Sequence, residues 1–218
     1  MRRLSGVFLA VVLVSSISTP ASAQQESWKN QWYWGAQAGT YVFTTATQST
    51  ELAFDWGIDW LITADRVGLR LGFDQVIFAS GTTGAVSDGS GGARTVDFGL
   101  MQRWQGELYA LPTTGQLQIA VAGGFTINNI TDAQPTGSFS SPQEEEAVRQ
   151  IIDDATSKAF FTIGASIRYL VGTRWAAFAK YQFMPKSNEF LLTGAQQAIT
   201  AGISYALTVA SEQVSTER

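Results

Sequence analysis

Residues 50–62 read TELAFDWGIDWLI, and every second residue from Leu52 onward is large and apolar. The residues between them, as far as Asp59, are small or charged. A period of two places alternate side chains on opposite faces of a β-strand. The stretch therefore predicts a strand whose two faces meet unlike environments. The apolar face consists of Leu52, Phe54, Trp56, Ile58, Trp60 and Ile62, and the other of Glu51, Ala53, Asp55, Gly57 and Asp59.

The sizes of the two sets indicate which environment each face meets. Large apolar side chains point inward in a water-soluble barrel, whereas in a membrane-spanning barrel they point to lipid. Two Trp, one Phe and three large aliphatic residues from one strand would overfill a small barrel, while Gly, Ala and Asp suit a narrow interior. We expect a transmembrane barrel. The alternative is a secreted, soluble β-barrel that binds a small apolar ligand.

The next stretch, 67–74, continues the alternation, with Arg70 and Asp74 on its polar face. A two-residue turn at 64–65 would join the two strands into a hairpin. This register places Asp59 opposite Arg70 and Asp55 opposite Asp74. The second pair has like charges, so it needs a cation nearby.

Six further segments alternate in the same way, which brings the expected number of strands to eight. In the segment 94–111, we expect Val96 and Phe98 to face lipid, and Asp97 to face the lumen with Arg103 and Glu107. The aromatic residues near the strand ends, Phe43 and Phe98 among them, predict girdles at the two membrane surfaces. The six segments are 31–45, 94–111, 116–127, 158–170, 174–184 and 195–207.

The connections alternate between short and long, which is typical of an up-and-down transmembrane barrel with short periplasmic turns and longer external loops. In the loop 128–157, Ser141 precedes Pro142 and lies three residues before Glu144, a capping-box arrangement. We therefore expect a short external helix. Its apolar stripe, which includes Val148 and Ile152, would either cover the barrel mouth as a lid or offer a docking face to a partner, and we favour the lid.

The N-terminus of the chain predicts export. Residues 1–23 have the order of a cleaved signal peptide: Arg2 and Arg3, an apolar run, and the small residues 21–23. No later stretch has the 18 or more apolar residues of a membrane-spanning helix. We expect a signal peptide at 1–23, an N-terminal segment at 24–30, the barrel at 31–207 and a short periplasmic tail at 208–218.

Composition narrows the possible functions. The 218 residues include no Cys and no His, which excludes thiolate metal sites, cysteine nucleophiles and His-dependent catalysis. The net charge of −4 argues against a nucleic-acid partner, which requires a basic face. We expect no enzymatic activity, no cofactor and no metal site.

The pattern as a whole resembles the small eight-stranded outer-membrane β-barrels of Gram-negative bacteria, the superfamily of the OmpA transmembrane domain and the OmpX- and OmpW-like proteins. The last strand carries a motif similar to the assembly signal of this class: Thr200, Gly202, Tyr205 and Leu207 stand at its polar, glycine, aromatic and terminal hydrophobic positions. The resemblance implies a monomer in the cell outer membrane, with membrane lipid and the barrel assembly machinery as partners. An external partner could bind the long loops. From the eleven residues 208–218, we expect no OmpA-type peptidoglycan-binding domain in the tail.

The polar face of the strands carries the candidate functional residues. Five acids and four bases could form an ion-pair network that fills the lumen, because an eight-stranded barrel has room only for side chains. We favour this network and a structural or surface-interaction role, and a small-solute or ion channel is the alternative. The residues are Asp55, Asp59, Asp74, Asp97, Glu107, Arg70, Arg103, Arg168 and Lys180.

Overall fold

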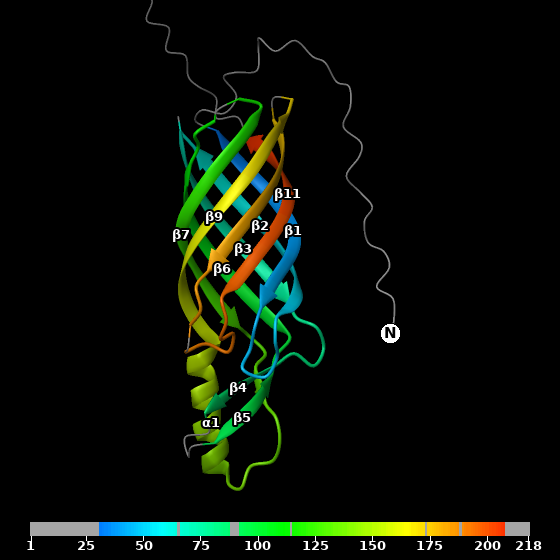
Figure 1. Ribbon diagram of the computed structural model, residues 1–218, viewed down its shortest axis with the longest axis vertical. Coiled ribbons are helices and arrows are strands. Elements are labelled where there is room, and N and C mark those ends of the chain that lie inside the picture. The colour runs from blue at the N-terminus through cyan, green and yellow to red at the C-terminus, as the bar shows by residue number, and fades with distance from the viewer. Residues whose placement is uncertain are drawn as a thin grey trace, which may run out of the picture.

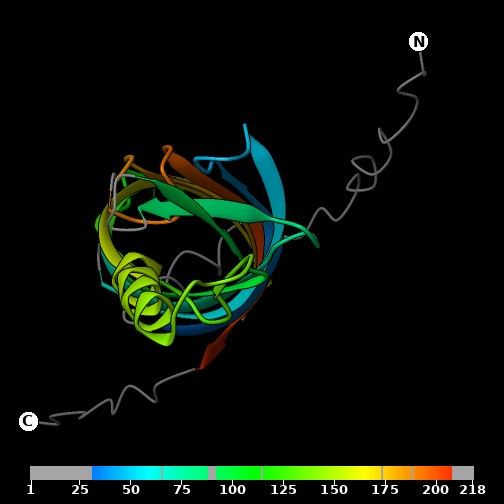
Figure 2. The same ribbon diagram turned by 90° about the horizontal axis from the view of Figure 1, so that it is seen from below.

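The computed structural model describes residues 31–207 except 65, 88–91, 114, 173 and 188. The predicted signal peptide, N-terminal segment and periplasmic tail lie outside the described residues. Eight antiparallel strands close into a barrel in which each strand pairs with its neighbours along the chain and the last pairs with the first (Figures 1 and 2). The predicted fold class is confirmed. The barrel strands are β1 (Trp32–Phe43), β2 (Glu51–Thr63), β3 (Val67–Ile77), β6 (Leu100–Ala110), β7 (Leu117–Ile130), β9 (Ser157–Val171), β10 (Trp175–Met184) and β11 (Gln196–Leu207).

The strand faces follow the predicted alternation. On β2, Leu52, Phe54, Trp56 and Ile58 are 40–63% exposed, whereas Asp55 and Asp59 are buried. Small inward residues allow the wall to curve tightly: a Cβ placed on Gly57 would lie 2.4 Å from the Phe73 carbonyl oxygen. Apolar side chains therefore cover the outside of the barrel, while the interior holds mostly charged and polar side chains and a small cluster that includes Leu61 and Leu111.

The hairpin of β2 and β3 has a different register from the predicted one. Asp59 pairs with Gly72, and Asp74 with Gly57. The Ala64 N–H donates to the Val67 carbonyl oxygen (2.8 Å), so the hairpin turns one residue further along the chain than expected and the pairing is shifted by two residues. A shift of two preserves which face each side chain occupies. It also separates Asp55 from Asp74, so the predicted like-charge pair does not lie directly across the ladder.

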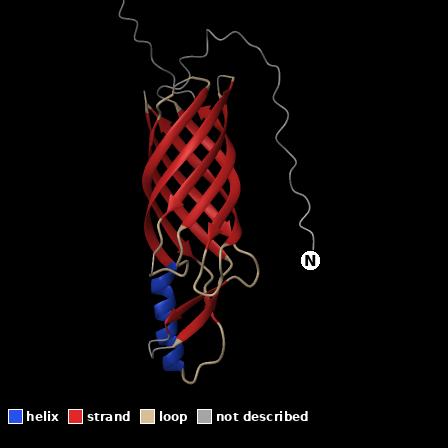
Figure 3. Cartoon of the chain, in the orientation of Figure 1, coloured by secondary structure: helices blue, strands red, loops and turns tan. Residues whose placement is uncertain are grey.

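The predicted strand 94–111 is divided in two. β5 (Ala93–Asp97) ends before Phe98, and β6 begins at Leu100. The Asp132 carboxylate accepts hydrogen bonds from the Gly99 and Leu100 N–H groups, which stabilises the break. Val96 and Phe98 do not face lipid as expected: both are buried. Together with β4 (Thr83–Ser87) and β8 (Gln134–Pro135), β5 forms a small sheet beyond the barrel (Figure 3).

The external helix is confirmed as α1 (Pro142–Thr156), with Ser141 as its N-cap. The Glu144 N–H donates to the Ser141 hydroxyl (3.2 Å), and the Glu144 carboxylate accepts from the Ser140 N–H (2.8 Å). Arg94 of β5 forms an ion pair with Glu144 (2.6 Å). α1 extends away from the barrel beside β4 and β5 (Figure 1). It does not lie across the barrel mouth, as the predicted lid would.

We refer to α1, the β4–β5–β8 sheet and the loop 185–194 as the cap. Val148 and Ile152 of α1 are at most 2% exposed and pack in one apolar cluster with Val86, Val96 and Phe98. The helix stripe is thus covered by the sheet. Leu191 donates from its N–H to the Ala155 carbonyl oxygen (3.1 Å). The same cluster includes Phe190, Leu191 and Leu192 of the cap loop and reaches the external end of the barrel at Tyr41, Phe43, Met101 and Met184.

Candidate functional site

The external half of the lumen centres on Arg103 of β6. Its guanidinium lies 3.1 Å from the Asp55 carboxylate and 3.4 Å from that of Asp74, and all three side chains are fully buried. The same group stacks over the Tyr41 ring, 4.9 Å from its centroid. Because β2, β3 and β6 each contribute one charged residue to this cluster, it ties three strands together across the interior.

The half of the lumen nearer the short turns centres on Arg70 of β3. Its Nε lies 2.9 Å from Asp59, and its Nη1 lies 2.9 Å from Glu107 and 2.8 Å from the Gln105 side-chain oxygen. Tyr109 donates to Glu107 at 3.3 Å. Although Asp59 does not pair with Arg70 across the ladder, the long guanidinium side chain reaches it diagonally.

Arg168 and Lys180 enter this second half from β9 and β10. Arg168 donates to the Ser204 hydroxyl (3.2 Å) and lies 4.9 Å from the centroid of the Tyr33 ring. Lys180 is 4% exposed. The structure therefore brings eight of the nine predicted residues into the lumen.

Asp97 is the exception, and its predicted lumenal position is wrong. It is exposed at the end of β5, in the external sheet. The break at Phe98 and Gly99 separates β5 from the wall, so the alternation along β6 no longer determines where Asp97 points. Without Asp97, four acids and four bases remain in the lumen: Asp55, Asp59, Asp74 and Glu107 with Arg70, Arg103, Arg168 and Lys180.

Buried amides connect the two charge clusters, and the sequence analysis did not single them out. Gln105 donates to Asp74, and Gln182 donates to Gln105 (2.8 Å) and Glu107 (2.6 Å). Gln37 donates to Asp74 at 2.6 Å. All three amides occupy the same alternating face as the charges, which was the signal that could have identified them.

The four motif residues of β11 lie at two kinds of position. Thr200 and Gly202 face the lumen, where a Cβ on Gly202 would lie 2.2 Å from the Ala36 carbonyl oxygen of β1. Tyr205 lies at the outer rim with its ring centroid 4.9 Å from that of Trp175, and Leu207 is 45% exposed. Gly202 thus permits the close approach of β1 and β11 where the barrel closes.

Outside the membrane-spanning segments, Lys158 and Glu189 join the external end of β9 to the cap. The Lys158 ammonium donates a hydrogen bond to the Glu189 carboxylate, and this bond, with the attraction between the charges, lowers the pKa of Glu189 below its usual value. Across the described part of the chain, no group of three or more acidic side chains is arranged to hold a metal ion. Within those same ranges, no helix is both long and apolar enough to cross a membrane.

Comparisons with known proteins bear on the fold. No family model and no curated protein matches the sequence. Among solved structures, Neisserial surface protein A (NspA) is 10% identical with a TM-score of 0.53, over 80% of this chain and 96% of that one. Ail of Yersinia pestis, solved with the heparin analogue sucrose octasulfate, is 9% identical (TM-score 0.46; 82% of this chain and 99% of that one). OprG of Pseudomonas aeruginosa is also 9% identical (TM-score 0.47; 84% and 99%).

Of these three structures, NspA has the TM-score above 0.5, and at 10% identity the similarity concerns the fold alone. The match extends over nearly the whole of NspA and most of this chain. It agrees with the closed eight-stranded topology described above. The chain therefore has the fold of the small eight-stranded outer-membrane β-barrels.

Proposed function

We propose that this protein is an exported, monomeric outer-membrane barrel with a closed lumen, and that its role is structural or lies in interactions of the cap at the cell surface. The observation that carries the proposal is the apolar outer wall. Residues near the middle of four different strands are half exposed there: Ile58, Val121, Ile163 and Ile203, at 49–58%. An exposed apolar ring around a polar interior suits a protein whose solvent is lipid.

The same wall counts against a soluble barrel that binds an apolar ligand. Such a protein needs the large apolar face of β2 to line an internal cavity. Trp56 and Ile58 point outward instead, and Asp55 and Asp59 occupy the interior.

The lumen supports a closed barrel over the channel alternative. Arg70 and Arg103 extend into it and are hydrogen-bonded to carboxylates of β2, β3 and β6. The short-turn half encloses a cavity of about 20 Å³, which holds about one water-sized particle. A hydrated ion is larger than this.

Cell fractionation tests the location. We expect the protein to sediment with outer membranes and to migrate faster on gels before heating than after it, because folded barrels resist detergent. Recovery from the periplasm without detergent would contradict the proposal.

Planar-bilayer recording tests the closed lumen. The purified protein should show no large steady conductance. Discrete channels that disappear in Arg70→Ala or Asp59→Ala would favour the channel alternative.

The assembly role of β11 can be tested separately. Gly202→Leu should lower outer-membrane levels because its side chain meets the β1 backbone, and Tyr205→Lys should lower them through lost recognition by the assembly machinery. Deletion of 211–218 is the matched control and should be tolerated. If the deletion alone abolishes insertion, the signal lies in the tail and not in β11.

A further inference from the structure

Charge is unevenly divided between the two halves of the lumen. In the external half, Arg103 faces two carboxylates, those of Asp55 and Asp74. In the short-turn half, Asp59 and Glu107 are both bound to Arg70, and two more cations, Arg168 and Lys180, lie in the same half. Among the described residues, the lumenal charges therefore sum to zero, yet this half carries three bases for two acids.

Lys180 is the base without a partner. Its Nζ atom is buried and makes no hydrogen bond or ion pair with any described residue. The nearby carboxylates of Asp59 and Glu107 each bind Arg70. A buried ammonium without a hydrogen-bonding counter-charge is costly, so a compensating group is expected beside it.

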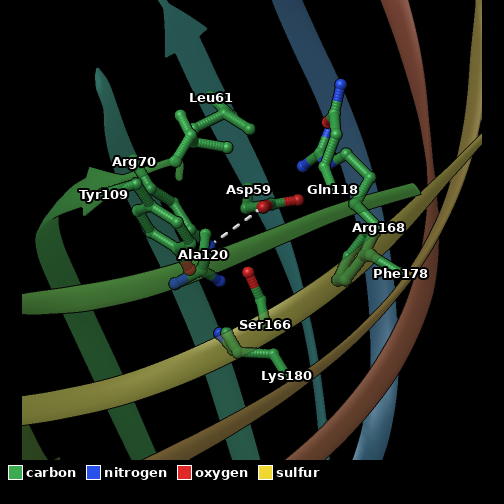
Figure 4. A pocket seen from close by; sticks show the side chains of 11 residues that line it. Asp59, Leu61, Arg70, Tyr109, Gln118, Ala120, Ser166, Arg168, Phe178 and Lys180 are labelled. Atoms are coloured by element: carbon green, nitrogen blue, oxygen red, sulfur yellow. Dashed lines mark hydrogen bonds and ion pairs between the residues drawn. The ribbon is translucent and has the colours of Figure 1, made fainter. Parts of the chain in front are cut away.

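The cavity of about 20 Å³ lies beside this ammonium (Figure 4). Two further donors among its lining residues are buried and without a partner, Nε2 of Gln118 and Nη2 of Arg70, and so are two acceptors, Oε1 of Gln118 and Oδ1 of Asp59. The Ser166 hydroxyl also lines it. One Asp carboxylate and three basic side chains surround the space, those of Asp59, Arg70, Arg168 and Lys180.

We propose that this cavity binds one small monovalent anion of the size of chloride. Three unpartnered donor groups outnumber the two unpartnered acceptors, and three basic side chains face one carboxylate, so the site favours an anion over a cation. The volume admits about one water-sized particle, which excludes phosphate, sulfate and carboxylate-bearing molecules. A water molecule would satisfy donors without adding the missing negative charge, whereas the anion does both. The inference concerns the lumen and does not depend on the role of the cap.

Halide-dependent unfolding of the full-length protein, folded in detergent micelles, tests the site. Unfolding should be about twofold slower or more in sodium chloride than in sodium gluconate at equal ionic strength, and the effect should saturate, because a ligand that binds only the folded state stabilises it. Gluconate is the control anion because it is too large for the cavity. Equal unfolding rates in the two salts would overturn the proposal.

Two variants locate the effect. Lys180→Met keeps most of the side-chain volume, removes the unpaired charge and leaves two bases with two acids, so it should fold and lose the chloride dependence. Lys158→Met removes a lysine that is already paired with Glu189 outside the lumen, and it should keep the dependence. Loss of the dependence in both variants, or in neither, would contradict this site.

Crystals of the unaltered protein grown in sodium bromide provide a test that does not require any variant to fold. Bromide scatters anomalously, and we expect one peak within hydrogen-bond distance of Lys180 Nζ. Density for water alone at that position, or bromide only at the protein surface, would overturn the proposal.

Discussion

The barrel and the cap bury opposite kinds of residue, although one continuous chain builds both. In the barrel, charged residues such as Arg103 and Asp55 are fully enclosed while Ile58 is 49% exposed. In the cap, Val96 and Val148 are fully enclosed, while Asp97 and Arg149 lie outside. The difference shows where the surrounding solvent changes from lipid to water. The two regions bury different chemistry, so matched substitutions should have different consequences in the two.

The largest expected effect is in the cap. Val148→Asp combined with Ile152→Asp places two carboxylates in an apolar cluster without partners, which should unfold the cap and leave the barrel intact. External protease should then cut within the cap, while the gel shift on heating remains. The control is Ala147→Asp with Gln150→Asp on the exposed face of α1, which should keep protease resistance. Loss of the barrel's gel shift in the first variant would show that the two regions unfold as one unit.

The next largest effect is in the lumen. Arg103→Met leaves the carboxylates of Asp55 and Asp74 buried without their cation, which should lower the free energy of unfolding by about 3–5 kcal/mol. Arg149→Met is the matched change in the cap. There the ion pair with Glu145 is exposed, so we expect a loss of about 0.5 kcal/mol or less. Urea unfolding in lipid vesicles measures both, and similar losses would contradict the distinction between the regions.

The next effect concerns the outer wall, where a substitution can place a charge in contact with lipid. Ile58→Arg, near the middle of β2, should cost about 2–4 kcal/mol in the same measurement. Ile58→Leu keeps the apolar surface and should be nearly neutral. A soluble protein would tolerate arginine at a half-exposed position, so an unchanged stability in Ile58→Arg would count against a wall that faces lipid.

The smallest effect is at the junction of the two regions. Lys158 lowers the pKa of Glu189 in the folded protein, so this pair stabilises the fold above the ordinary carboxyl pKa, and the contribution disappears as the pH falls through the lowered value. Lys158→Met should return the pKa of Glu189 toward its ordinary range. NMR titration of the Glu189 carboxyl carbon measures the change. Because Glu189 is exposed, salt should weaken the effect, and an unchanged titration curve would show that the pair does not form in solution.

The sequence predicted the barrel well because period-two alternation records which face meets lipid. The faces of β2 and eight of the nine lumenal charges follow from it directly. It could not fix the register of β2 and β3, because a shift of two residues leaves every side chain on the same face. The partners of Arg70 depend on that register and on the reach of its side chain, so the prediction gave the members of the network but not its pairs.

The failures at Val96, Asp97 and Phe98 have a second cause. Their alternation continues that of β6, but beyond the bilayer an apolar side chain is buried in the protein instead of facing lipid. Phe43 fails for a related reason: it lies 1% exposed at the barrel's external end, where the apolar cluster of the cap begins, and so takes no part in an aromatic girdle. A pattern that is the same on both sides of the membrane surface cannot show where that surface lies.

The helix α1 ends at Thr156, and β9 begins at the next residue. Fifteen residues at about 1.5 Å each make α1 about 22 Å long, and it runs on from the wall along the long direction of the molecule. There is no linker at this junction to act as a joint. The far end of α1 is therefore held at one height and one angle relative to the barrel. An antibody directed at this end would meet the same epitope geometry on every copy.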